Sequence, residues 1–121
     1  MAFKFEKIQI WQDAVAFASD IYELSRKYPK SEQYGLVNQL TRAAVSISLN
    51  IAEGEGRNSD TELARFLQIS TGSLNEVVTI LHISLNQQFI TQQDFDCFYA
   101  RCEELSKMLH GFKRYLKSPR L

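Results

Sequence analysis

One run of polar side chains in this 121-residue sequence could do chemistry. It lies within residues 35–62, and its members recur at intervals of three or four: Arg42, Ser46, Asn50 and Glu53. Residues at this spacing share one face of a helix, so they form a polar stripe, which Glu62 and Glu76 could approach. We interpret the stripe as a structural network between helices or subunits, because such networks can fix the geometry of an assembly. The alternative is a site for a ligand or an RNA backbone.

No catalytic or metal-binding motif accompanies the polar stripe. His82 and His110 are isolated, and we interpret each as a surface or half-buried side chain rather than a ligand or base. The ExxH spacing of di-iron bundles is absent, and so are the glycine-rich phosphate-binding motifs and GxSxG. The sequence therefore predicts a protein that is not an enzyme and that needs no metal or cofactor.

The charged residues are balanced over the whole chain but not along it. There are 14 Lys and Arg residues against 14 Asp and Glu residues, so no net charge draws the protein to nucleic acid or membrane. No acidic residue follows Glu104, and the cations after it are Lys107, Lys113, Arg114, Lys117 and Arg120. We interpret them as a solvated helix end whose charges suit the helix dipole. A tail that contacts nucleic-acid phosphates is the alternative.

The cysteines and the apolar runs indicate where the protein works. Cys97 and Cys102 lie about 140° apart around a helix, so they are poorly placed to bridge each other. Reduced thiols fit a cytoplasmic protein. The sequence has no signal peptide and no apolar run of membrane-spanning length. We therefore expect a cytoplasmic protein with no membrane contact.

Four long helices are expected to position these residues. The chain has only two prolines and five glycines to interrupt them, and its length suits a single domain, residues 1–121, with one core. The expected helices span about residues 7–27, 32–56, 60–87 and 92–116. Because links this short reverse the chain direction at each turn, the sequence predicts an all-α, up-down-up-down antiparallel four-helix bundle.

Apolar residues at intervals of three and four predict the buried face of each helix. In the first helix the predicted seam is Ile8, Trp11, Val15, Ala18, Tyr22 and Ser25. In the third helix the predicted core face is Leu63, Phe66, Leu67, Ser70, Leu74, Val77, Leu81 and Ser84. The fourth helix has the most regular seam, which consists of Phe95, Phe98, Cys102, Leu105, Leu109, Phe112 and Leu116.

The second helix has two apolar faces. Its core stripe is Val37, Leu40, Ala44, Ile47 and Ile51. A second apolar strip, Val45, Leu49 and Ala52, lies on one flank between this core stripe and the polar stripe. A surface helix of a lone bundle needs only one apolar face. We therefore expect the second strip to contact a partner subunit. A loop or terminus of the same chain is the alternative cover.

Capping signals mark where the later helices begin. Ser31 is a plausible N-cap of the second helix. Ser59 and Glu62 match a capping box at the start of the third helix, in which each side chain bonds the other residue's backbone amide. Thr91 and Asp94 have the same spacing before the fourth helix. These signals place the helix starts independently of the apolar pattern.

Three glycines are expected to serve the backbone. Gly54 and Gly56 are expected to let the chain leave the second helix. Gly72 costs about 1 kcal/mol of helix propensity relative to alanine. A close approach of another helix at this level would explain why glycine is tolerated there.

These segments resemble a family of bacterial four-helix-bundle proteins, the 23S rRNA-intervening sequence proteins. The most specific matches are RAAVSI at residues 42–47 and NIAEG at residues 50–54, and the resemblance covers about residues 5–110. The chain departs from the family pattern at Thr41, where relatives often have a second arginine. It also departs at Ser48, where many have proline, so the second helix is not expected to kink.

The resemblance implies a four-helix bundle that assembles into a ring-shaped homopentamer. Similar bundles are accessory variability proteins of retroelements, in which a basic pentamer associates with nucleic acid and a reverse transcriptase. Together with the second apolar strip, this predicts a non-catalytic homo-oligomeric scaffold or adaptor with a protein or RNA partner. The alternative is a nucleic-acid-binding accessory protein that acts through its basic C-terminal helix.

Overall fold

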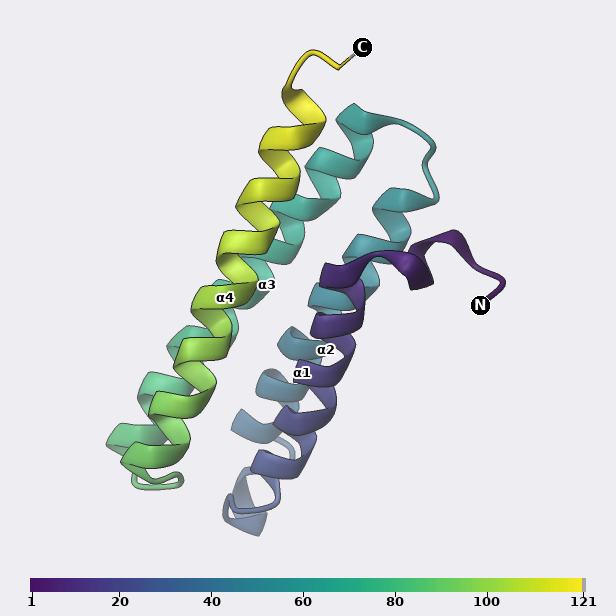
Figure 1. Ribbon diagram of the computed structural model, residues 1–121. Helices are drawn as coiled ribbons and strands as arrows, with labels where there is room; N and C mark the ends of the chain where they lie inside the picture. The colour runs from purple at the N-terminus through teal and green to yellow at the C-terminus, as the bar shows by residue number, and fades with distance from the viewer. Residues whose placement is uncertain (121) are drawn as a thin grey trace.

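The computed structural model describes residues 1–120, and these form an antiparallel bundle of long helices (Figure 1). The helices are α1 (Gln9–Ser25), α2 (Leu36–Glu55), α3 (Asp60–Asn86) and α4 (Gln92–Lys117). Both chain termini and the α2–α3 turn lie at one end of the bundle, and the other two turns lie at the opposite end (Figure 1). The predicted up-down-up-down four-helix architecture is confirmed.

Two helices begin later than predicted, because short 3₁₀ turns precede them. Residues Lys4–Lys7 form one turn before α1, and Lys30–Glu32 form another before α2. Ser31 is therefore not the N-cap of α2. Gly35 occupies that position, with φ −111° and ψ −106°, outside the helical region. The Glu32 carboxylate accepts a hydrogen bond from the Leu36 amide at 3.3 Å, so it satisfies one of the first free amides of α2.

The caps of α3 and α4 differ in one respect from the prediction. Ser59 Oγ accepts a hydrogen bond from the Glu62 amide at 3.3 Å, as expected. The Glu62 side chain does not complete the capping box, because it accepts charge-assisted hydrogen bonds from Arg65 instead. The box of α4 is complete: Asp94 N–H donates to Thr91 Oγ1 at 3.0 Å, and Thr91 N–H donates to Asp94 Oδ2 at 3.3 Å.

Helix α1 buries only part of the predicted seam: Ala18 is buried, and Ile8 and Trp11 pack against the core. Val15 and Tyr22, which were expected in the core, are 37% and 52% exposed. The buried face consists of Ile10, Ala14, Phe17, Ala18, Ile21 and Leu24. Both sets of residues follow the three-and-four spacing, but this set is entirely apolar. The predicted seam would have buried a tyrosine hydroxyl and a serine, which need hydrogen-bond partners in a core.

The core faces predicted for the other helices are confirmed. Every residue of the predicted α3 face is buried. The α2 core stripe and the α4 seam are also in the core, with Val37, Phe98 and Phe112 half-buried. The Ser70 hydroxyl crosses from α3 to α2 and donates to the Ile47 carbonyl at 2.9 Å. Neighbouring helices are therefore joined by a buried hydrogen bond in addition to their apolar contacts.

Each helix packs most extensively on its neighbours in sequence, and α1 and α4 share the smallest interface. That interface centres on the Phe17 and Phe98 rings, whose centroids are 6.1 Å apart. The Arg101 guanidinium lies over both rings, at 5.3 and 5.6 Å, and also pairs with Asp20 at 2.7 Å. A few aromatic and charged contacts therefore close the bundle between its first and last helices.

The glycines have other roles than those predicted. Gly54 lies inside α2 and Gly56 has helical dihedrals, so neither turns the chain out of the helix. The turn is made at Asn58, whose φ is 55°, in the left-handed region that asparagine tolerates. A Cβ at Gly72 would meet nothing within 4 Å, whereas one at Gly54 would lie 2.7 Å from the Phe66 Cβ. Within the subunit, the close helix approach is at Gly54 and not at Gly72.

Lys27 and Asp94 join the end of α1 to the start of α4. Lys27 Nζ lies 2.9 Å from both carboxylate oxygens of Asp94, whose side chain is 18% exposed. Burial raises the pKa of Asp94, but hydrogen bonds from Lys27 and Thr91 outweigh it and hold the pKa below its ordinary value. This carboxylate therefore stabilises the fold above the ordinary aspartate pKa and ceases to do so as the pH falls through the lowered value.

We expect Asp94→Asn to lower the melting temperature by about 2–4 °C near neutral pH, because the ion pair with Lys27 is lost. The difference from wild type should shrink as the pH falls through the lowered pKa of Asp94, because the wild-type carboxyl then becomes protonated as well. Thermal unfolding followed by circular dichroism over this pH range measures it. Glu103→Gln is the control, since Glu103 is exposed and has no ion-pair partner within residues 1–120. A difference that persists unchanged at low pH would contradict the assignment.

Candidate functional site

The outer side of α2 has an open groove of about 600 Å³, between α1 and α3. Its lining includes five residues of the predicted polar network and second apolar strip: Arg42, Val45, Ser46, Leu49 and Glu76. Tyr22 of α1 and Ser73 of α3 form part of its sides. The fold therefore brings most of the predicted interface to one concave surface.

The second apolar strip of α2 contributes the exposed apolar side chain of this groove. Leu49 is 62% exposed, while Val45 and Ala52 are half-buried. The alternative, that a loop or terminus of the same chain covers this strip, holds only near the end of α2. There the turn Lys4–Lys7 packs against α2, and Lys4 Nζ lies 3.7 Å from the Glu55 carboxylate. Leu49 is left open by every part of residues 1–120.

The middle of the polar stripe is a structural network between α2 and α3. Asn50 Nδ2 donates to the Ser46 carbonyl at 2.8 Å and to Ser46 Oγ at 2.9 Å. Ser73 Oγ on α3 donates to the same Ser46 Oγ at 2.9 Å. Arg42 stands apart, because it is exposed and has no hydrogen-bond or ion-pair partner in the described part of the chain. The middle of the polar stripe is thus fully hydrogen-bonded, whereas the Arg42 guanidinium at one end is free.

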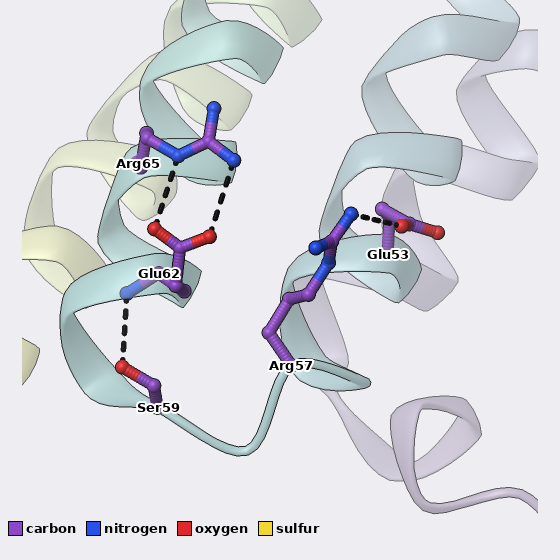
Figure 2. A network of polar contacts seen from close by, with 5 residues as sticks. All are labelled: Glu53, Arg57, Ser59, Glu62 and Arg65. Carbon is purple, nitrogen blue, oxygen red and sulfur yellow. Dashed lines mark hydrogen bonds and ion pairs between the residues drawn. The ribbon is translucent and has the colours of Figure 1, made fainter.

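The acidic residues at the other end of the predicted site pair locally (Figure 2). Glu53 accepts a hydrogen bond from Arg57 at 2.8 Å, and Glu62 accepts two from Arg65 at 3.1 and 3.2 Å. The hydrogen bond from Arg65 lowers the pKa of Glu62. Figure 2 shows the two pairs on either side of the α2–α3 turn, so Glu62 does not join the polar stripe.

Phe66 was not among the predicted site residues, but it organises these two pairs. Its buried ring has the Arg57 guanidinium at 5.1 Å from the centroid and the Arg65 guanidinium at 4.5 Å. Arginines stacked on an aromatic face gain cation–π stabilisation. The spacings of Glu53 to Arg57 and of Glu62 to Arg65, four and three residues, were the available signal for these pairs.

Two of the five C-terminal cations are engaged with the bundle. Lys113 on α4 donates a hydrogen bond to the side chain of Gln68 on α3. Arg120 forms an ion pair with Asp60 and donates to the Tyr115 carbonyl at 2.7 Å. Its guanidinium also lies over the Tyr115 ring, at 4.4 Å. These two residues therefore fasten the end of the chain to α3 and α4.

The other three cations, Lys107, Arg114 and Lys117, are exposed and have no ion-pair partner within residues 1–120. They lie in an arc of about 80° around α4. The predicted basic tail is thus reduced to a stripe of three free charges on the solvent side of one helix.

The remaining reactive side chains do not converge. Cys97 is exposed and Cys102 is buried, both are free thiols, and burial raises the pKa of Cys102 to about 12. The His82 ring packs against Phe95 and Tyr99, with centroids 4.9 and 6.1 Å away. Across the described residues, no group of three His, Cys, Asp or Glu side chains could hold a metal ion. In the same range, no helix is long and apolar enough to cross a membrane.

A family model identifies the family, and a solved structure supports the fold. The family model described as "23S rRNA-intervening sequence protein" matches residues 6–111. A solved structure from Bacteroides thetaiotaomicron, of a protein with unknown function from the S23 ribosomal protein family, has the same fold, with a TM-score of 0.80. It shares 22% sequence identity, and the match covers 87% of this chain and 95% of that one. No curated protein matches the chain.

Proposed function

Since the chain belongs to the 23S rRNA-intervening sequence protein family, we propose that it is a non-catalytic helical scaffold that assembles with copies of itself. We expect a closed ring of five copies, as the sequence resemblance implies, which offers a surface to a protein or RNA partner. The observation that supports this best is the exposure of Leu49, 62%, in an open groove on the outer side of α2.

The groove has the chemistry of a subunit interface. Burying a leucine side chain contributes about 1.5–3 kcal/mol, and Leu49 retains most of its surface in the single subunit. Arg42 on α2 and Glu76 on α3 carry opposite charges on this groove, and neither has a partner within residues 1–120. In a ring, each subunit presents two different surfaces to its neighbours. Free charges of both signs beside an apolar side chain favour such a contact, since complementary charges align two surfaces.

A structural role is also supported by the serines of the groove. Ser46 and Ser73 line the groove with hydroxyls that could in principle act as nucleophiles, but these hydroxyls are hydrogen-bonded to each other. Ser46 Oγ also accepts from Asn50, and Ser73 Oγ lies 3.3 Å from the Ile69 carbonyl. No histidine or carboxylate contacts either hydroxyl in the described chain. Their hydrogen bonds hold α2 and α3 in register.

Leu49→Glu is expected to weaken assembly at least tenfold, because a buried carboxylate without a partner costs several kcal/mol. Sedimentation velocity and native mass spectrometry measure the oligomer, and circular dichroism checks that the bundle remains folded. Ile83→Glu is the matched control, since Ile83 is an exposed apolar residue of α3 outside the groove, 42% exposed. A wild-type protein that is monomeric at micromolar concentration, or a Leu49→Glu variant that assembles normally, would overturn the proposal.

The free cations of α4 favour a second candidate function, nucleic-acid binding through this helix. Lys107, Arg114 and Lys117 lie on one exposed face without carboxylate partners in residues 1–120. Three cations per subunit neutralise few phosphates, but a ring repeats the same face in every subunit. Avidity then strengthens weak single contacts, with a steep salt dependence.

A further inference from the structure

A second cavity, of about 500 Å³, lies between the end of α1 and the start of α2. These helix ends lie at the end of the bundle opposite the chain termini (Figure 1). Its inner lining is Tyr28, Val37 and Thr41, which are buried or half-buried. The Tyr28 hydroxyl donates to Ser84 Oγ at 2.6 Å, and Thr41 Oγ1 donates to the Val37 carbonyl at 2.9 Å. Because both hydroxyls already donate their protons, they can serve a ligand only as acceptors, beside the apolar side chain of Val37.

Two tyrosine rings border this cavity and are open to solvent. Tyr34 is 91% exposed and Tyr22 is 52% exposed, and neither ring packs on another aromatic ring within residues 1–120. They come from separate elements, Tyr22 from α1 and Tyr34 from the turn that precedes α2. Exposed rings of this kind are platforms on which a planar base can stack.

The charged residues that line the cavity are both positive. Arg26 and Lys30 are exposed at its border, and no Asp or Glu side chain is part of its lining. Arg26 has an exposed partner in Glu23 at 3.4 Å, a pair that solvent weakens. Lys30 has no partner in the described residues. Gln33 and Asn38 add amide groups that can both donate and accept hydrogen bonds.

We propose that this cavity binds an aromatic base that carries a phosphate, either as a free nucleotide or as one residue of a single-stranded nucleic acid. The base stacks on Tyr34 and Tyr22, the phosphate contacts Arg26 and Lys30, and the amides contact the edge of the base. A cavity of about 500 Å³ is within the size range of small-ligand sites. Tyr22 and Asn38 line both this cavity and the α2 groove. Tyr34, Arg26 and Lys30 line the cavity alone, so substitutions at these three residues test it separately from the assembly surface.

The test uses fluorescence anisotropy of a fluorescein-labelled oligouridine at low salt, with full-length protein. Tyr34→Ala is expected to weaken binding about tenfold, and Tyr34→Phe to retain the affinity, because stacking needs the ring and not the hydroxyl. Arg26→Ala/Lys30→Ala is expected to weaken binding and to flatten its salt dependence. Tyr115→Ala is the control for the ring, since Tyr115 is 56% exposed at the other end of the bundle. Lys4→Ala/Lys7→Ala is the control for the loss of two cations, since both residues are exposed and lie outside the cavity and α4. Lys107→Ala/Lys117→Ala separately reports any binding through the cations of α4.

The competitors distinguish the source of the ligand. Displacement of the probe by AMP supports a free nucleotide, and displacement only by unlabelled oligouridine supports a strand. Inorganic phosphate should not displace it at equal concentration, since it has no ring. No saturable binding by the wild type, an unchanged Tyr34→Ala, or a loss confined to the Lys107/Lys117 variant would overturn the proposal. Native mass spectrometry of the same samples reports assembly separately, so a failure of the scaffold proposal is recognised independently.

Discussion

Gly54→Ala is expected to destabilise the bundle by about 2–3 kcal/mol, although alanine is the better helix former. The added methyl carbon would lie 2.7 Å from the Phe66 Cβ and 2.9 Å from the Leu63 Cδ1. It would also lie 3.3 Å from the Leu63 Cα, so the backbone of α3 as well as its side chains must move. Urea unfolding, with a shifted midpoint and an unchanged slope, measures the loss of free energy.

Gly72→Ala and Gly111→Ala are the matched controls. Apart from the backbone of its own helix, neither position has an atom within 4 Å of an added Cβ, and both lie inside long helices. Each substitution is expected to stabilise the subunit by up to about 1 kcal/mol. A Gly54→Ala variant as stable as wild type would mean that α2 and α3 can separate at their crossing without cost. If Gly72→Ala is stable but assembles poorly, then a second copy, rather than a helix of the same chain, approaches α3 at this glycine.

Phe17→Ala is expected to cost about 3–5 kcal/mol, the usual range for a phenylalanine removed from a core. Phe17 is 1% exposed, and it packs against Phe98 under the Arg101 guanidinium. Its loss leaves a cavity and also removes the surface on which Arg101 rests. Because this is the smallest interface of the bundle, few other contacts compensate.

Tyr22→Ala is the comparison, since it removes a ring of similar size from the same helix. Tyr22 belongs to the seam predicted from spacing but is 52% exposed, so its effect on unfolding should stay within about 0.5–1 kcal/mol. Chemical denaturation of both variants, under conditions where the protein is monomeric, decides between the two faces. Equal losses would restore the predicted seam of α1 and contradict the orientation seen in the structure.

Helix number, order and approximate bounds followed from spacing and capping because these signals are local. The α4 seam, for example, has a single apolar frame, and Thr91 caps the helix where the pattern begins. In helix α1, two sets of residues follow the three-and-four spacing, one through Val15 and Tyr22 and one through Phe17 and Ile21. Only the packing of neighbouring helices distinguishes them, and a periodic pattern contains no information about neighbours.

The candidate site was predictable to the same extent. Five of its residues share one face of α2 or the adjoining turn of α3, and helical periodicity identified the α2 residues. The ion pairs were not foreseen although their spacings of four and three residues were available, because Glu62 was assigned to the capping box and the polar stripe instead of to Arg65. Tyr22, Arg26, Lys30 and Tyr34 meet at a second cavity, yet they come from a helix end and an irregular turn. No spacing rule connects such positions, so their proximity appears only in three dimensions.

The order of the helix contacts has a consequence for how the chain acquires its fold. Contacts between sequential helices join residues close in sequence, and such topologies fold rapidly, on the scale of microseconds to milliseconds. Each helix can dock on the one made before it as the chain leaves the ribosome. All contacts of α4, with α3 and with α1, must wait until α4 is synthesised, and those with α1 include Arg101 with Asp20. Until then the growing chain exposes the Phe17 side of α1, and closure by α4 completes the subunit.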